Sequence, residues 1–180
     1  MSQEAGKKEI SSKSVPSRSS VLIGFMGSGK STCGKIAAKR AGISFLDTDK
    51  EIEKQAGKSI SAIFKDEGEE AFRILETETL KRLAGRKGRC IYSVGGGTPL
   101  REENRKLLKK LGKVIYLKAS PEAVLERLKG NTTRPLLQGD NPEKKVRELM
   151  AERQEIYEAA ADITIDTDPY SPREIASMLI

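Results

Sequence analysis

The sequence predicts an α/β fold in which a five-stranded parallel sheet lies between two layers of helices. Short runs rich in β-branched residues alternate with helical stretches, and this alternation is typical of α/β domains. The expected strands are apolar along most of their length, as strands are when helices cover both faces of a parallel sheet. They occupy residues 21–23, 43–46, 90–94, 114–117 and 163–165.

The expected helices begin and end at residues suited to those positions. The first runs over residues 29–41 and stops at Gly42, because glycine favours a helix end. Three later helices each begin at a capping residue followed by proline, at Ser120, Asn141 and Ser171. Ligands of open α/β sheets bind beyond the carboxyl ends of the strands, so we expect the chemistry at that edge.

The length of 180 residues predicts a single domain. Residues 1–19 are rich in serine and in basic side chains with little to pack, and we interpret them as a flexible tail before one domain over residues 20–180. A Ser-rich transit peptide is the functional alternative, but Glu4 and Glu9 argue against it.

The composition excludes several classes of function. The chain has no histidine, which removes Ser/His/Asp triads and zinc sites that contain histidine. Two cysteines cannot form a disulfide framework, and no apolar run reaches the roughly 20 residues that cross a bilayer. We therefore expect a soluble cytoplasmic protein with no membrane partner. The net charge of +7 suits an anionic ligand without identifying it.

A phosphate-binding loop is the most specific motif in the chain. Residues 24–31 match G-x-x-x-x-G-K-[ST] in full, after an apolar strand and before a helix. In such loops backbone N–H groups and the helix N-terminus face phosphate oxygens, the lysine reaches the β- and γ-phosphates, and the final hydroxyl binds Mg²⁺. A glycine-rich turn that only caps a helix would not need lysine followed by serine. The expected nucleotide ligands here are Gly27, Ser28, Gly29, Lys30, Ser31 and Thr32.

Two carboxylates follow the second expected strand. Asp47 and Asp49 are alternate residues of an extended segment, so both can point toward the phosphate loop. One could help to hold Mg²⁺ and the other could meet an acceptor hydroxyl. Because the third strand contains no acidic residue, we expect Asp47 to be the metal ligand beside Ser31. The structural alternative is that Asp49 caps a helix over residues 50–56.

A charged helix and a glycine triplet supply further candidates. Arg73 and Glu76 lie three apart on a helix expected to open at Gly68, where they can pair, although such pairs are usually solvated surface contacts. The third strand ends in the triplet 95–97, which is costly unless the backbone passes close to a ligand. A plain loop turn is the alternative for the triplet.

A mobile lid is expected over about residues 130–140. The segment joins a helix to a loop containing Gly, Asn and Pro, from which Arg134 could swing over the transferring phosphoryl group. Arg153 lies on the helix after this lid and would otherwise be one more surface cation.

Taken together and in order, these motifs closely resemble the shikimate kinase family from about Val21 to the C-terminus. The phosphate loop marks any P-loop protein, whereas the combination of the other motifs is particular to this family. The segments that carry the resemblance are 24–31, 45–49, 72–76, 95–97, 131–137 and 152–157. The resemblance implies a nucleoside-monophosphate-kinase-like sandwich with strand order 2-3-1-4-5. It also implies ATP-dependent phosphorylation of the 3-hydroxyl of shikimate, with Mg²⁺, in aromatic amino acid biosynthesis.

The resemblance also assigns roles position by position. The shikimate site would comprise Asp49, Arg73, Gly95, Gly96, Gly97 and Arg153. The two arginines would clamp the carboxylate in planar bidentate pairs, and the aspartate would orient the 3-hydroxyl and is a candidate to accept its proton. The catalytic residues would be Lys30, Asp49 and Arg134. The adenine ring would lie between Arg127 and Pro172.

Two other functions are left open by the residues alone. One is a P-loop kinase that acts on gluconate or a nucleoside monophosphate, since the arginine clamp would also suit gluconate. The other is a nucleic-acid-binding protein, because residues 101–118 are rich in lysine and arginine. Glu102 and Glu103 interrupt that stretch and aromatic residues make up 4% of the chain, so a solvated helix face is the favoured interpretation. We expect a monomer that binds no nucleic acid.

Overall fold

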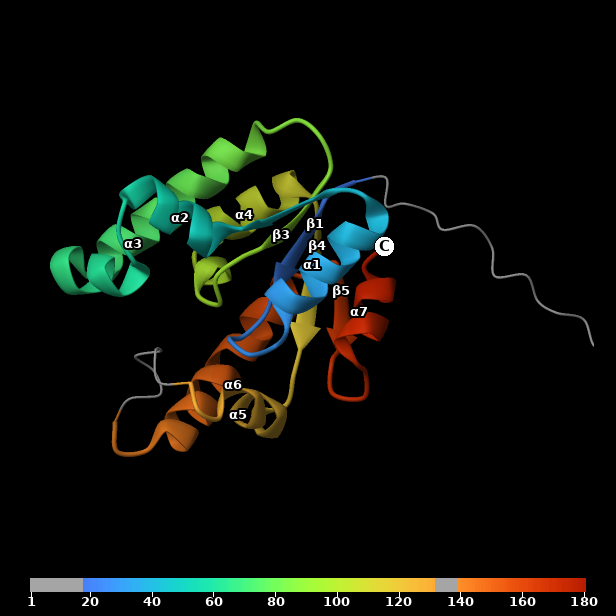
Figure 1. Cartoon of the computed structure of the whole chain (residues 1–180). Helices are drawn as coiled ribbons and strands as arrows, with labels where there is room; N and C mark the ends of the chain where they lie inside the picture. Colours follow the sequence, from blue (N-terminus) through green and yellow to red (C-terminus); the bar gives the residue numbers. More distant parts are fainter. Residues whose placement is uncertain (1–17, 132–138) are drawn as a thin grey trace, which may run out of the picture.

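A computed structural model describes residues 18–131 and 139–180. Five parallel strands form one sheet in the order β2-β3-β1-β4-β5, which confirms the predicted order (Figure 1). The strands are β1 (Ser20–Ile23), β2 (Ser44–Asp47), β3 (Cys90–Ser93), β4 (Lys113–Lys118) and β5 (Ile163–Asp166). No strand end differs from the predicted one by more than one residue.

The helices follow the strands as the alternation predicts. They are α1 (Lys30–Ala41), α2 (Thr48–Ala56), α3 (Ile60–Ala84), α4 (Glu102–Leu111), α5 (Pro121–Leu128), α6 (Pro142–Ala160) and α7 (Pro172–Met178), with a 3₁₀ turn, η1 (Thr98–Leu100). The three predicted capping residues are confirmed, because each side chain accepts a backbone N–H of its helix: Ser120, Asn141 and Ser171. Gly42 ends α1 in a left-handed conformation, as predicted.

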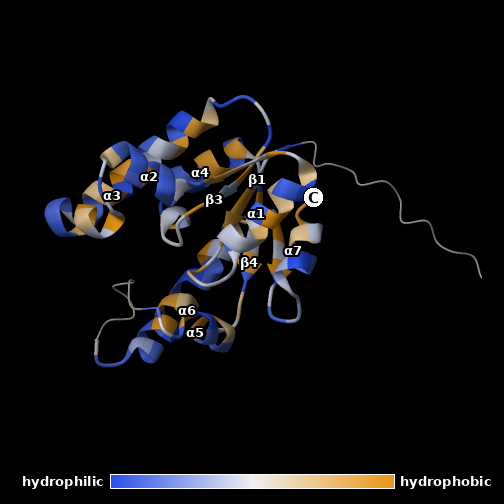
Figure 2. Ribbon diagram, viewed as in Figure 1, coloured by the Kyte–Doolittle hydropathy of each residue, from blue (hydrophilic) through white to orange (hydrophobic). Residues whose placement is uncertain are grey.

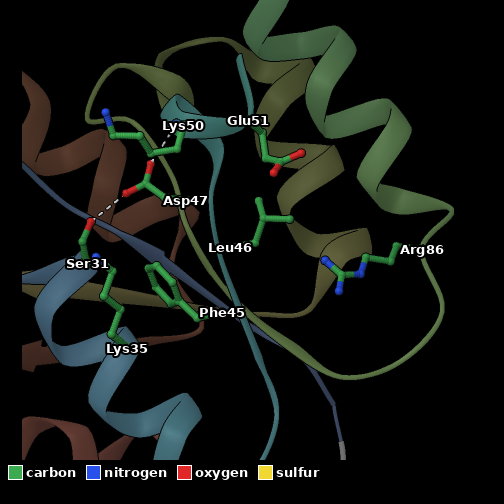
Figure 3. Close-up of a pocket in the computed structure, with 8 residues that line it drawn as sticks. All are labelled: Ser31, Lys35, Phe45, Leu46, Asp47, Lys50, Glu51 and Arg86. Atoms are coloured by element: carbon green, nitrogen blue, oxygen red, sulfur yellow. Dashed lines mark hydrogen bonds between the residues drawn. The ribbon is translucent and has the colours of Figure 1, made fainter. Parts of the chain in front are cut away.

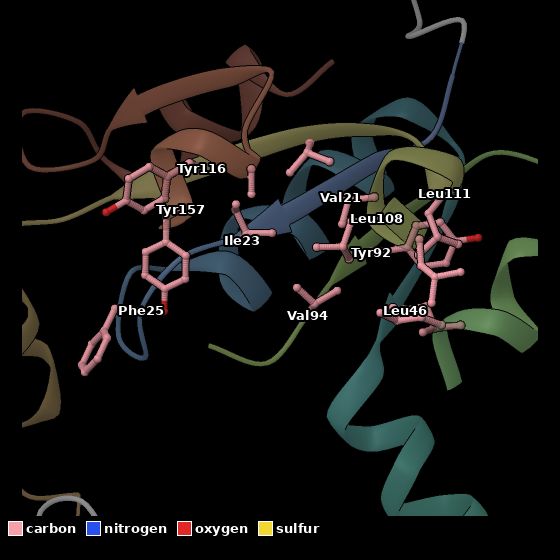
Figure 4. Packing of buried hydrophobic residues seen from close by; sticks show 14 of the residues in the cluster. Val21, Ile23, Phe25, Leu46, Tyr92, Val94, Leu108, Leu111, Tyr116 and Tyr157 are labelled. Atoms are coloured by element: carbon pink, nitrogen blue, oxygen red, sulfur yellow. The ribbon is translucent and has the colours of Figure 1, made fainter. Parts of the chain in front are cut away.

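Helices cover both faces of the sheet, as the apolar strands predict. Val21 and Ile23 of β1 face a cluster contributed by α3, α4, α5 and α6 (Figure 4). Leu22, between them, faces the opposite cluster, which is formed with α1 and α7. The hydrophobic interior and the hydrophilic outer helix faces are visible in Figure 2. None of the helices within the two described ranges is long and apolar enough to cross a membrane.

One structural alternative and one expected helix start are wrong. Asp49 does not cap α2: the cap is Asp47, whose Oδ1 accepts the backbone N–H of Asp49 at 3.0 Å and of Lys50 at 3.4 Å. The helix starts at Thr48 because an extended aspartate directly before it satisfies the free N–H groups of the first turn.

The helix expected to open at Gly68 begins earlier, at Ile60, with Ser59 as its cap. Gly68 is a break inside it, with φ 85° and ψ 172°. A residue without Cβ adopts that conformation readily, so the chain bends there and continues as a second helical segment. The second segment carries Arg73 and Glu76.

Candidate active site

The phosphate loop joins β1 to α1 and its backbone is tightly constrained. Gly24 has φ 144°, and a Cβ at this residue would lie 2.6 Å from the carbonyl oxygen of Leu117, so only glycine fits. Lys30 Nζ donates to the carbonyls of Gly24 at 2.8 Å and Phe25 at 2.9 Å. No side chain caps α1 and its first turn has no acidic residue. The positive end of this helix therefore suits an anion.

Ser31 and Asp47 meet directly at the start of α1. Ser31 Oγ donates to Asp47 Oδ2 at 2.8 Å (Figure 3). The same Ser31 Oγ lies 3.2 Å from Ser93 Oγ. The register of the sheet explains the meeting, because Asp47 of β2 pairs with Ser93 of β3 and Leu22 of β1 pairs with Ser93 from the other side. A carboxylate and a hydroxyl are hard oxygen donors, and Mg²⁺ in phosphate-transfer sites commonly takes one or two such protein ligands. The residues therefore fit a magnesium ion.

A hollow of about 580 Å³ opens beside this pair at the edge of the sheet (Figure 3). Among the predicted site residues that the structure describes, Ser31 and Asp47 line it. The other lining residues are Lys35, Phe45, Leu46, Lys50, Glu51 and Arg86. The hollow thus reaches the expected metal position, and the expected acceptor residues lie elsewhere.

Asp49 is held in the first turn of α2 in an unfavourable electrostatic position. Its Oδ1 is buried and has no hydrogen-bond partner among the described residues. Burial raises the pKa of Asp49 and the negative charges of Asp47 and Glu76 add to this effect, so that the pKa is about 6 despite the opposing charge of Lys30. A carboxylate with one open oxygen and a raised pKa is suited to accept a proton near neutral pH.

The glycine triplet lies against charged side chains of α2 and α3. A Cβ on Gly95 would lie 2.9 Å from Asp49 Oδ1 and 3.0 Å from Glu76 Oε1, and a Cβ on Gly97 would overlap the guanidinium of Arg73. The structure therefore brings Asp49, Arg73 and the triplet together. The absence of side chains at 95–97 leaves room for these groups of the protein itself, so the triplet is packed more closely than a plain loop turn requires.

Arg73 is part of a partly buried charge cluster, and the surface-pair interpretation is wrong. Arg73 Nη1 donates to Glu76 Oε2 at 2.6 Å and Arg73 Nη2 to Glu69 Oε1 at 3.2 Å. The Glu76 side chain is 2% exposed, because η1 and α4 cover this side of α3. Spacing along one helix predicts that Arg73 and Glu76 can pair, but it cannot predict that η1 and α4 bury the pair.

Arg153 reaches the same region from α6. Its guanidinium lies 5.7 Å from the ring centroid of Phe25 in the phosphate loop. Tyr157, one turn later, donates its hydroxyl to the carbonyl of Gly96 at 2.6 Å and packs its ring on Tyr116 (Figure 4). Burial raises the pKa of Tyr157, while the charge and hydrogen bond of Arg153 act in the opposite direction. Sequence reasoning gave Tyr157 no role, although it ties α6 to the triplet.

Of the two expected adenine residues, Arg127 lies beside the phosphate loop, and the lid arginine is not described. Arg127 of α5 donates to the carbonyl of Gly27 at 3.1 Å and to Thr167 Oγ1 at 3.4 Å. Pro172 is the first residue of α7, which follows Thr167 in the chain. Arg134, the central part of the predicted lid and most of the predicted tail lie outside the described residues. Cys33 of α1 is 1% exposed, and burial raises the pKa of its thiol.

Comparison with solved structures separates the shared fold from the closer relationship. A gluconokinase from Sinorhizobium meliloti matches with a TM-score of 0.53 and 18% identity over 88% of this chain and 87% of that one. A likeness at this level shows the fold alone. A shikimate kinase from Acinetobacter baumannii, solved in complex with shikimate, matches with a TM-score of 0.84 and 40% identity over 91% of each chain.

Sequence comparison gives the same relationship over nearly the whole chain. A shikimate kinase from Thermodesulfovibrio yellowstonii is 48% identical over 160 residues, which is 89% of this chain and 91% of that protein. One from Geobacter sulfurreducens is 46% identical over 168 residues, or 92% of each. The family model described as shikimate kinase matches residues 26–180. Together with the phosphate loop, the Ser31–Asp47 pair and the glycine triplet with its charged neighbours, these matches show that the chain belongs to the shikimate kinase family.

Proposed function

We propose that this protein transfers the γ-phosphoryl group of ATP to the 3-hydroxyl of shikimate, giving shikimate 3-phosphate and ADP. The proposal depends on one observation above all: Asp49, Arg73 and the glycine triplet lie together near the phosphate loop. A small acid bound there would present a hydroxyl to the terminal phosphate. The acceptor is the compound bound in the related Acinetobacter baumannii structure.

On the acceptor side, Arg73 and Arg153 would hold the carboxylate. Arg73 Nη2 contacts the exposed Glu69, whose carboxylate an incoming acid could replace, while Nη1 stays on the buried Glu76. Asp49 would accept a hydrogen bond from the 3-hydroxyl through its open oxygen and take up its proton as the new O–P bond forms. The triplet 95–97 would allow the ring to approach the backbone.

On the donor side, the phosphate loop would cradle the phosphates. The N–H groups from Gly27 to Thr32 and the ammonium of Lys30 would stabilise the charge that moves onto the β-phosphate oxygen as the β–γ bond breaks. Ser31 and Asp47 would hold Mg²⁺, which neutralises phosphate charge when bound. Arg134 would add a cation from the lid, and Arg127 with Pro172 would hold adenine.

The decisive test is acceptor-dependent release of ADP. We expect turnover with shikimate and Mg²⁺, and little with gluconate or a nucleoside monophosphate. Turnover with another acid but not with shikimate would reject the proposed substrate.

No turnover with any acceptor, together with salt-sensitive binding of labelled RNA, would instead favour a nucleic-acid-binding protein. The structure offers little support for that function, since several basic groups of the 101–118 stretch form ion pairs: Arg101, Lys106, Lys109 and Lys118.

Replacing Arg73 by alanine should separate the two substrates. The acid loses a bidentate partner worth about 2–3 kcal/mol, so the KM for shikimate should rise on the order of a hundredfold while the KM for ATP changes little. Steady-state kinetics with each substrate varied in turn will measure both constants. Lys81→Ala, which removes an exposed cation of the same helix, is the matched control. Equal losses for both substrates in Arg73→Ala would contradict the assignment.

A further inference from the structure

Behind Arg73 lies a chain of buried hydrogen bonds that the proposed reaction does not use directly. Thr98 Oγ1 donates to Glu76 Oε1 at 2.6 Å, while the other oxygen of Glu76 accepts from Arg73. Asn104 Nδ2 donates to the carbonyl of Thr98 at 2.9 Å, and Thr77 Oγ1 donates to Asn104 Oδ1 at 2.7 Å. The chain therefore joins α3, η1 and α4 directly under the glycine triplet.

These groups are sealed from solvent. Thr98 is 1% exposed, Asn104 is 0% exposed, and Glu76 and Thr77 are almost as deeply buried. Buried polar groups that are fully hydrogen-bonded specify one arrangement, because every alternative leaves a donor or acceptor unsatisfied. Both oxygens of Glu76 are occupied, so the plane of its carboxylate is fixed by Thr98 on one side and by Arg73 on the other.

Glu76 holds one end of the Arg73 guanidinium and so constrains its orientation. A guanidinium binds a carboxylate in two parallel hydrogen bonds only when its plane is correctly set. Gly97 gives the guanidinium room on one face, and the Glu76 carboxylate holds Nη1. The 3₁₀ turn that presents Thr98 is in turn held by Asn104, through the Thr98 carbonyl.

We propose that Thr98 and Asn104 are positioning residues that orient Arg73 through Glu76 and so set the affinity for the acid substrate. This inference rests on the proposed function. Neither residue touches the acid itself, and both act at a distance through a charged pair. The two residues lie 22 and 28 positions after Glu76, so helical spacing could not reveal the connection.

The test uses Thr98→Val, which keeps the shape and removes the hydroxyl, with Thr98→Ser as the conservative variant. We expect the KM for shikimate to rise about tenfold or more in Thr98→Val with the KM for ATP nearly unchanged, and Thr98→Ser to restore most of the loss. Asn104→Asp, which removes the amide donor, should move the same constant. Thr79→Val removes a buried hydroxyl of α3 outside this hydrogen-bond chain and is the matched control.

A double-mutant cycle with Arg73→Ala separates positioning from general stability. If Thr98 acts through Arg73, Thr98→Val should add little to the KM for shikimate once Arg73 is removed. Full additivity, or an unchanged KM in both Thr98→Val and Asn104→Asp, would overturn the inference. The wild-type protein is assayed first, and no turnover with shikimate there would reject the proposed function. An active wild type whose KM for shikimate is unchanged in the variants would reject only the inference.

Discussion

At the scale of single residues, Asp49 links the electrostatics of the site to its pH dependence. Burial, reinforced by Asp47 and Glu76, raises its pKa to about 6. The proposed proton acceptor must be ionised, so kcat/KM for shikimate should fall as the pH drops through about 6, approaching about tenfold per pH unit. A pH profile at saturating ATP measures this. ADP binding by Asp49→Asn over the same range controls for titration of the nucleotide, and an activity profile flat down to pH 5 would contradict the assignment.

The raised pKa of Asp49 also predicts that the folded protein becomes more stable when the charge of this side chain is removed. Between its ordinary pKa of 3.8 and the folded value of about 6, the folded protein holds more protons than the unfolded chain, so stability falls as the pH rises through this window. Asp49→Asn should therefore raise the free energy of unfolding by up to about 3 kcal/mol at pH 7.5. The gain should vanish below the ordinary pKa.

Urea unfolding of both proteins at high and at low pH will measure this difference. Asp66→Asn is a suitable control because that carboxylate of α3 is 56% exposed at the surface. A variant that is less stable than the wild type at pH 7.5 would show that Asp49 contributes a favourable contact. Asp49→Asn should lose activity whatever its stability, because active-site residues often reduce the stability of the folded state in exchange for function.

At the scale of elements, the phosphate loop depends on close packing more than on backbone freedom alone. A Cβ on Gly24 would press against the backbone of β4, whereas one on Gly42, also at positive φ, would meet nothing within 4 Å. Gly42→Ala should therefore cost only about 1–2 kcal/mol of stability, with ATP affinity unchanged.

Gly24→Ala should lower stability further and weaken ATP binding at least about tenfold, because the displaced loop carries the carbonyls that hold Lys30. Thermal unfolding and nucleotide titration of the two variants make the comparison. Equal effects of the two substitutions on ATP binding would show that positive φ, and not contact with β4, is what the loop requires.

Element boundaries were predictable where local chemistry sets them. Ser120, Asn141 and Ser171 start helices because a cap and a following proline act within one turn. The alternative in which Asp49 caps α2 could not be rejected from the sequence, because Asp47 and Asp49 are equally good caps in isolation and the end of strand β2 decides between them. The helical segment before Gly68 was missed for a similar reason: its packing against α2 comes from tertiary structure.

At the scale of the whole molecule, the sequence predicted which layers form, and family resemblance supplied the order of the strands. The alternation of apolar strands and capped helices is a local signal, and it sufficed for the fold class. The convergence of Asp49 and Arg73 on the triplet is not local, and it was expected only through the resemblance. The sequence did not predict that Thr98 and Asn104 lie behind Glu76, because threonine and asparagine carry no distinctive pattern and only tertiary packing brings them there.

The carboxylate of Asp47 serves two elements at once. One oxygen accepts from Ser31 at the head of α1, and the other anchors the start of α2, which carries Asp49. A shift of Asp47 Oδ2 toward a metal-bound nucleotide must therefore also move the start of α2, which carries the residue that faces the acceptor. Linkage then requires each substrate to alter the affinity of the other by an equal factor. Calorimetric titration of shikimate with and without magnesium ADP, and of magnesium ADP with and without shikimate, should give two matching ratios different from one. A ratio of one would mean that the two binding events are independent despite their shared side chain.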